Sequence, residues 1–126
     1  MILKEYSVWV NNRWDNDPRP ARDKIAIAAM GITGEAGEVS EPLKKALYSG
    51  KVVDRAYMVK ELGDLLHYWV RIAGILGISP EEIMDANVEK LMERLPEGHA
   101  PVPTAQYAAD CILLSNTATQ ELKRVR

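Results

Sequence analysis

The chain alternates between stretches with helical periodicity and short polar breaks. In the periodic stretches, apolar residues recur every three or four positions, as they do on one face of an α-helix. No alternating run of apolar and polar residues is long enough to indicate a sheet. We therefore predict an all-α bundle of four to five helices, with helices at about 2–14, 21–48 and 54–76 and a further one that begins at Pro80.

The breaks between these stretches carry helix stop and start signals. Gly50 suits the end of the second predicted helix, and Gly77 suits the end of the third. Ser79 can serve as the N-cap of the fourth helix, with Pro80 at its first position and Glu82 completing a capping box. This boundary is the most strongly signalled in the sequence.

Length and composition indicate one folded unit. The chain has 126 residues, of which 47% are hydrophobic, and this suits one globular core with no room for a second. The composition changes at Pro96, because the segment PEGHAPVPT carries three prolines and predicts an extended connection. We expect one domain at residues 1–98 and a C-terminal tail at 99–126, extended at first and then loose or a short helix.

The charge balance identifies no partner. With 16 basic and 18 acidic residues, the formal net charge of -2 gives no general attraction to a nucleic acid polymer or an anionic membrane. Cys111 is the single cysteine, so neither an intrachain disulfide nor a zinc site of paired cysteines is available. The N-terminus lacks the apolar core of a signal peptide, and no segment approaches the roughly 20 apolar residues of a membrane span. We expect a soluble cytoplasmic protein.

Two pairs of acidic residues have the same spacing on successive predicted helices. Glu35 and Glu38 lie in the second helix, Glu61 and Asp64 lie in the third, and each pair falls at one edge of an apolar arc. If the two arcs pack together, four carboxylates converge, and their repulsion favours a bound hard cation such as Mg²⁺ or Mn²⁺. A solvated helix edge is the alternative for either pair alone, but two matching pairs favour the metal site.

The fourth predicted helix places complementary charge beside its apolar face. Asn87, Lys90 and Arg94 fall within one narrow sector of the helical wheel. Lysine and arginine suit phosphate oxygens, and an asparagine amide both donates and accepts, as recognition of a sugar or base edge requires. The alternative is an ordinary helix surface with glutamate partners such as Glu89 or Glu93.

Aromatic residues of the first predicted helix are candidates for holding a nucleobase. Trp14, with Tyr6 and Trp9, can form a wall on which any base would stack. The alternative is that the tryptophans are core or interface anchors. We expect Trp69 in the core, and His67 at the surface or an interface instead of among the metal ligands.

Three segments together closely resemble the MazG-like all-α nucleoside triphosphate pyrophosphohydrolases: GEAGEVSEPLKKALYSGK, KELGDLLHYWVRIAGILGIS and NVEKLMERLPEG. The resemblance covers roughly Ile25 to Gly98, in order and with the spacing of the family. It implies that the domain at 1–98 is MazG-like and that Mg²⁺ is held by Glu35, Glu38, Glu61 and Asp64. It also implies that the nucleotide is contacted by Asn87, Lys90 and Arg94. Gly34 stands where many members have a further glutamate, so the task of that acid is absent or falls to Glu41.

The resemblance also implies an activity, which is Mg²⁺-dependent hydrolysis of a (deoxy)nucleoside triphosphate to the monophosphate and pyrophosphate, usually for nucleotide-pool house-cleaning. Glu35 or Glu38 would act as the base. Four helices of this length enclose little core, so a homodimer or homotetramer is expected. The alternatives are a non-enzymatic helical interaction module with a structural metal, a phosphoribosyl-ATP pyrophosphatase-like enzyme, and a di-iron bundle. A di-iron bundle normally needs the motif Glu-x-x-His twice, and this chain offers one acid-x-x-His motif, from Asp64 to His67.

Overall fold

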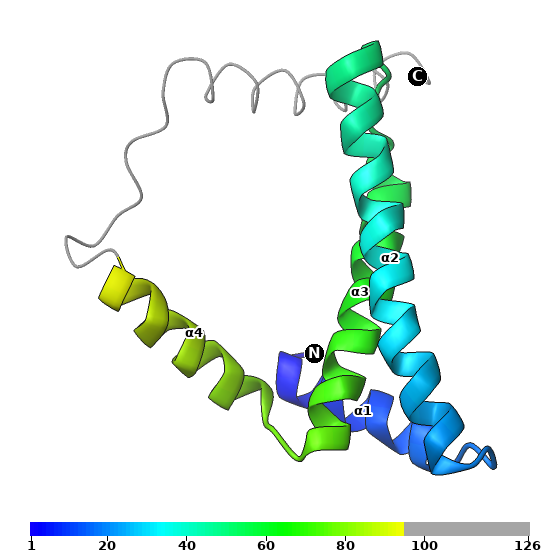
Figure 1. Cartoon of the computed structure of the whole chain (residues 1–126), viewed down its shortest axis with the longest axis vertical. Helices are drawn as coiled ribbons and strands as arrows, with labels where there is room; N and C mark the ends of the chain where they lie inside the picture. The colour runs from blue at the N-terminus through cyan, green and yellow to red at the C-terminus, as the bar shows by residue number, and fades with distance from the viewer. Residues whose placement is uncertain (95–126) are drawn as a thin grey trace.

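The computed structural model describes residues 1–94, and this part of the chain forms four helices and no strand (Figure 1). The helices are α1 (Leu3–Asp15), α2 (Ala21–Ser49), α3 (Arg55–Leu76) and α4 (Pro80–Arg94). The predicted all-α fold class is confirmed. Within these residues no helix has both the length and the apolar character needed to cross a bilayer. The predicted tail at 99–126, with Cys111, lies outside the described residues, and the division at residue 98 stays a prediction.

The two long helices form the frame of the molecule. α2 and α3 run antiparallel and lie side by side, joined by a short connection at one end (Figure 1). α1 crosses the opposite end of the pair and packs mainly on α3. α4 starts from that same end, contacts α1, and then diverges from the α2–α3 pair. The described helices therefore form a packed pair with one crossing helix and one projecting helix.

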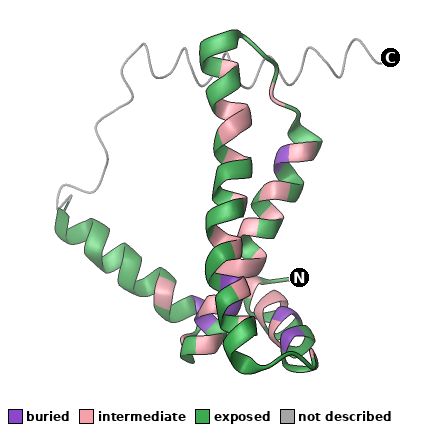
Figure 2. Ribbon diagram, turned by 45° about the vertical axis from the view of Figure 1, so that its right-hand side comes forward, coloured by how far each residue is buried: buried purple, intermediate pink, exposed green. Residues whose placement is uncertain are grey.

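The buried core lies where α1 crosses the long helices. Its central residues are Val10, Trp14, Ala28 and Val70. Figure 2 shows most buried positions gathered at this end, whereas α4 and much of α2 are exposed. A core of this size leaves much apolar side-chain surface in contact with solvent within one chain.

A buried arginine joins α1 to α3. Arg71 is 8% exposed, and its Nη1 donates to Oδ1 of Asn11 at 2.8 Å and to Oδ1 of Asp15 at 3.2 Å. Its guanidinium also lies over the Trp14 ring, 5.3 Å from the ring centroid. Because Asn11, Trp14 and Asp15 all belong to α1, these contacts fix the angle at which α1 crosses α3.

The observed helix ends follow local chemistry. Gly50 ends α2 with a φ of 62°, in the left-handed region that glycine adopts without strain. The Asp54 carboxylate caps α3 and accepts from the backbone N–H of Tyr57 at 3.3 Å. Oγ of Ser79 accepts from the backbone N–H of Glu82 at 3.1 Å, so the predicted N-cap of α4 is confirmed.

A glycine allows α2 and α3 to approach closely beside the two acid pairs. A Cβ atom at Gly31 would lie 2.5 Å from the Tyr68 ring. Gly31 is one helical turn before Glu35, and Tyr68 is one turn after Asp64. The packing of this ring on the bare backbone of α2 therefore sets the separation of the helices next to these carboxylates.

Candidate functional site

Three of the four acidic residues singled out from the sequence lie close together. Glu35, Glu61 and Asp64 each offer a carboxylate oxygen, and these oxygens all lie within 4.8 Å of one another. Glu35 belongs to α2, whereas Glu61 and Asp64 occupy successive turns of α3. Glu35 and Glu61 are half-buried, and Asp64 is exposed. We call these three residues the acidic cluster; it spans the α2–α3 interface and is open to solvent on one side.

The acidic cluster carries uncompensated negative charge. The pKa of Glu35 is raised by partial burial and then by the charges of Asp64, Glu61 and Glu38. No ion pair with a lysine or arginine of residues 1–94 relieves any member of the cluster. Oxygen donors at this mutual distance suit a hard divalent cation, which would convert the repulsion into attraction.

Glu38 lies near the acidic cluster but is not part of it. The Tyr57 hydroxyl donates to Oε2 of Glu38 at 2.7 Å and so bridges α3 and α2. This hydrogen bond is also the main reason why the pKa of Tyr57 is raised well above its ordinary value. Tyr57 was not among the predicted site residues, although its position one turn before Glu61 on α3 was a usable signal.

Glu41 is engaged elsewhere on the surface of α2. Its two carboxylate oxygens pair with Lys44 Nζ at 2.6 Å and with Lys45 Nζ at 3.1 Å. Hydrogen bonds from these lysines lower the pKa of Glu41. Glu41 therefore has its own cationic partners and does not belong to the acidic cluster.

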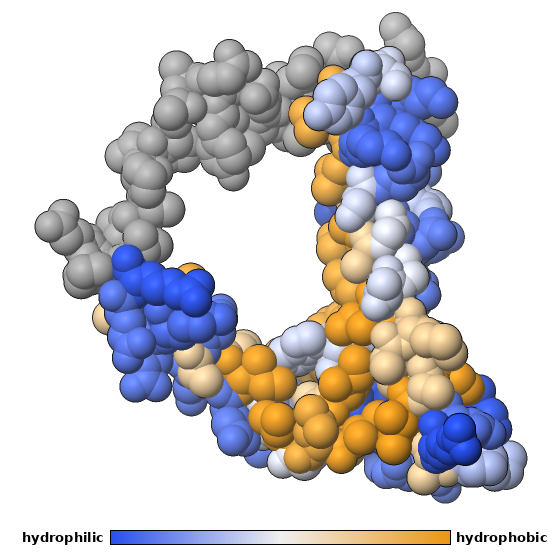
Figure 3. Space-filling model, viewed as in Figure 1, coloured by the Kyte–Doolittle hydropathy of each residue, from blue (hydrophilic) through white to orange (hydrophobic). Residues whose placement is uncertain are grey.

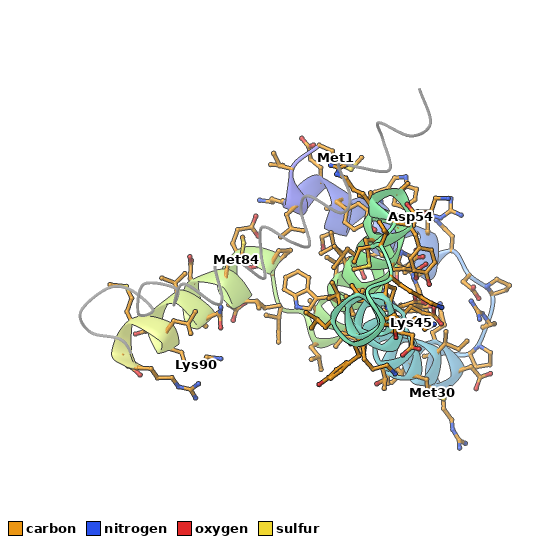
Figure 4. The ribbon with its side chains drawn as sticks, turned by 90° about the horizontal axis from the view of Figure 1, so that it is seen from above. Met1, Met30, Lys45, Asp54, Met84 and Lys90 are labelled. Atoms are coloured by element: carbon orange, nitrogen blue, oxygen red, sulfur yellow. The ribbon has the colours of Figure 1, made fainter. Side chains whose placement is uncertain are left out.

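The predicted phosphate- and base-binding residues of α4 stand apart from the acidic cluster within one chain. Asn87 and Lys90 line a groove of about 680 Å³ between α4 and the end of α3, together with Trp69. Figure 4 shows Lys90 far out on the projecting helix, away from Lys45 and Asp54 at the far end of the α2–α3 pair. Arg94 is the last residue of α4 and is exposed. Trp69, expected in the core, packs against the core cluster as a half-buried residue and also forms one wall of this groove.

Trp14 lines a second, smaller cleft while remaining part of the core. It is 8% exposed, and its Nε1 donates to Nε2 of His67 at 2.9 Å. The cleft measures about 360 Å³ and is lined by Trp14, His67, Tyr68, Arg13, Asp17, Arg19 and Ile27. Because Tyr68 follows Asp64 by one helical turn, the cleft adjoins the acidic cluster along α3.

His67 occupies a different environment from the one expected. It is half-buried against Trp14 instead of lying at the surface, because α1 crosses α3 at this position. Burial lowers the pKa of His67, which keeps the ring neutral and able to accept the indole hydrogen bond. Among the described residues, no histidine belongs to the acidic cluster, which disfavours a di-iron centre.

Comparisons with known proteins identify a matching family. The family model described as the MazG nucleotide pyrophosphohydrolase domain matches residues 26–99, a segment that contains both acid pairs and α4. The Gene 37 protein of Mycobacterium phage L5 is 31% identical in an alignment of 78 positions that covers 59% of this chain and 68% of that protein. No solved structure matches the chain. The match covers more than half of the sequence, and the chain belongs to the MazG nucleotide pyrophosphohydrolase domain family.

Proposed function

We propose that the protein hydrolyses nucleoside triphosphates to the nucleoside monophosphate and pyrophosphate with the help of Mg²⁺ or Mn²⁺. The observation that carries this proposal is the approach of three carboxylate oxygens to within 4.8 Å across α2 and α3, in a chain of the MazG family. Deoxynucleotides are the proposed substrates, with nucleotide-pool house-cleaning in the cytoplasm as the proposed role.

The residues present fit a hard divalent cation. Glu35, Glu61 and Asp64 offer only oxygen ligands, and the pKa of Glu35 is raised by burial and then by the negative charges of its neighbours. Glu38, nearby on α2, is the proposed fourth ligand. Mg²⁺ keeps part of its hydration and commonly takes phosphate oxygens as further ligands, so an open cluster suits it better than a closed cage.

The reaction itself is a displacement at the α-phosphorus. When bound, the divalent ion supplies charge neutralisation and Lewis acidity at the phosphate oxygens. Glu35 or Glu38 takes a proton from the attacking water while the water oxygen forms a bond to the α-phosphorus. The bond from the α-phosphorus to the bridging oxygen breaks, and pyrophosphate leaves with the electron pair. Lys90 and Arg94 stabilise the negative charge on the leaving group.

Trp14 is proposed to help hold the base. It forms a wall of the cleft that adjoins the acidic cluster, and Tyr68 in the same cleft packs edge-on to it at 6.2 Å between ring centroids. Because Trp14 is only 8% exposed, its contribution is to support this wall and not to offer a free stacking face.

A second copy of the chain is proposed to complete the site. Apolar side chains of α3 and α4 are exposed within one chain, among them Leu62 at 50%, Leu66 at 37% and Val88 at 54%. Figure 3 shows apolar surface extending along α3 and onto the base of α4. At the base of α4, Ile83 and Met84 line the groove together with Asn87 and Lys90. A homodimer or homotetramer would bury the surface and bring Lys90 and Arg94 of one copy to the acids of another.

The proposed assembly has a direct test. Light scattering after gel filtration should give the mass of a dimer or tetramer for the wild-type chain. Leu66→Asp, at the exposed apolar face of α3, should shift that mass towards the monomer, whereas Lys60→Asp, an exposed polar position of the same helix, should not. A wild-type monomer at micromolar concentration would overturn the shared site.

The activity is tested with a panel of ribonucleoside and deoxynucleoside triphosphates. Wild-type protein with Mg²⁺ should release monophosphate and pyrophosphate in equal amounts, and a chelator should stop the reaction. Release of inorganic phosphate in place of pyrophosphate would contradict attack at the α-phosphorus. Inactivity of folded, metal-loaded protein towards the whole panel would instead favour a non-enzymatic interaction module. Phosphoribosyl-ATP is assayed separately, and its turnover without turnover of the panel would indicate a phosphoribosyl-ATP pyrophosphatase-like enzyme.

A further inference from the structure

Tyr57 links the two helices that carry the acid pairs. It lies in the first turn of α3, where the Asp54 cap holds its backbone N–H, and its hydroxyl reaches across to Oε2 of Glu38 on α2 at 2.7 Å. Tyr57 also precedes Glu61 by one turn, so the phenol lies on the same side of α3 as the acidic cluster. The hydrogen bond therefore restrains the one acid of the four that the cluster does not include.

The hydrogen-bond partner of Glu38 differs in charge from the partners of the neighbouring acid, Glu41. Glu41 has both carboxylate oxygens paired with lysines, Lys44 and Lys45, and its charge is compensated. Glu38 is held through Oε2 by a neutral hydroxyl, and no cation of residues 1–94 forms an ion pair with it. Glu38 thus has no cationic partner among the described residues, and its second oxygen makes no hydrogen bond to them.

We propose that Tyr57 is a positioning residue that orients Glu38 as the fourth carboxylate of the metal site, holding Oε2 so that Oε1 is available to the ion. The inference rests on the proposed metal-dependent function. Ligating carboxylates are commonly held by such outer hydrogen bonds, and loss of one typically weakens metal affinity about 10- to 100-fold. A phenol suits this task because it fixes the carboxylate without neutralising it.

Metal binding in the absence of nucleotide tests this role of Tyr57. Mn²⁺ is titrated calorimetrically into wild-type protein and into Tyr57→Phe, which removes only the hydroxyl. We expect the variant to bind Mn²⁺ about 10- to 100-fold more weakly, with an unchanged helical circular dichroism spectrum. Tyr48→Phe is the matched control, because Tyr48 is 88% exposed on α2 and its hydroxyl makes no hydrogen bond to residues 1–94. Its affinity should equal that of the wild type.

Two further readouts separate positioning from a purely structural link. In a Glu38→Ala background, adding Tyr57→Phe should cause no further loss of Mn²⁺ affinity, because the hydroxyl then has no carboxylate to orient. The wild-type protein should also show a tyrosine ultraviolet difference signal on Mn²⁺ binding that Tyr57→Phe lacks and Tyr48→Phe retains. The signal itself is recorded on the unaltered protein, and the two variants assign it to Tyr57.

The outcomes are distinguishable. Equal or tighter Mn²⁺ binding by Tyr57→Phe, or an equal loss in the presence and absence of Glu38, would overturn the positioning role while leaving the metal site intact. Failure of the wild-type protein to bind Mn²⁺ or Mg²⁺ at all would overturn the proposed function together with this inference.

Discussion

Nε1 of Trp14, on α1, donates a hydrogen bond to Nε2 of His67, on α3, across 2.9 Å. A neutral imidazole can accept this bond, whereas an imidazolium carries hydrogens on both nitrogens and cannot. Burial lowers the pKa of His67 from its ordinary 6.5, with the charge of Asp64 acting in the opposite direction and that of Arg13 in the same direction. The crossing of α1 over α3 therefore depends on a histidine that stays neutral.

Protonation of His67 should destabilise the fold at low pH. Because its pKa is lower in the folded than in the unfolded chain, its contribution is fully present above pH 6.5 and is lost as the pH falls from 6.5 towards the folded-state pKa. Thermal unfolding over a pH series measures this loss. His67→Gln keeps a neutral acceptor and should flatten this part of the curve, and identical curves for the two proteins would contradict the role given to His67.

Metal binding should stabilise the protein through the acidic cluster. At a concentration 100 times its dissociation constant, a ligand of the folded state adds about 2.7 kcal/mol. Mg²⁺ should therefore raise the melting temperature by several degrees, and a chelator should reverse the rise. Glu61→Gln removes a repelling charge, so we expect its metal-free melting temperature to equal or exceed that of the wild type. It also removes a cluster oxygen, so we expect no rise of the melting temperature with Mg²⁺ and a turnover about 100-fold lower.

Glu41→Gln is the matched control for this experiment. Glu41 lies on α2 but pairs with lysines outside the acidic cluster. Its variant should keep both the Mg²⁺-dependent rise and the turnover. A normal rise in Glu61→Gln, or its loss in Glu41→Gln, would show that the metal is held elsewhere.

Two glycines of α2 should respond in opposite ways to the same substitution. Gly31→Ala forces a methyl group to within 2.5 Å of the Tyr68 ring, and overpacking of this kind typically costs about 1–3 kcal/mol, which exceeds the gain of about 1 kcal/mol in helix propensity. Gly34→Ala meets no atom of the described chain within 4 Å and should gain that propensity. Urea unfolding of both variants measures the two signs. A stabilised Gly31→Ala would mean that Tyr68 moves aside without cost.

The features that sequence analysis predicted depend on short-range geometry. Ser79 and Glu82 are three residues apart, so the N-cap of α4 follows from local chemistry. The approach of Glu61 and Asp64 to Glu35 follows from two helical wheels and the assumption that the apolar arcs face each other.

The features that sequence analysis missed depend on how helices are placed relative to one another. The bond from Tyr57 to Glu38 requires the register of α3 on α2, which no wheel contains. His67 was misjudged for a related reason, because its burial comes from α1. Trp69 packs against the core as expected, but the groove that it also lines depends on the placement of α4. Neither feature can be deduced from the periodicity of α3.

The separation of Lys90 from the acidic cluster leads to a complementation experiment. If the site combines acids of one copy with α4 of another, Glu61→Gln and Lys90→Ala should each be nearly inactive when assayed alone. In a mixed dimer, one site receives both altered residues and the other receives neither. Co-refolding the two variants in equal amounts should therefore restore about a quarter of wild-type activity per chain, since half of the dimers are mixed and each has one intact site.

The control for complementation uses two changes in one element. Mixing Glu61→Gln with Glu35→Gln alters two acids of the same cluster, which both come from a single chain. Every site in such a mixture lacks one acid, so no activity should return. Restored activity requires Lys90 and Glu61 to reach one site from different copies. If the mixture of Glu61→Gln and Lys90→Ala is inactive although its mass shows that it contains mixed dimers, both residues belong to a site formed within one chain.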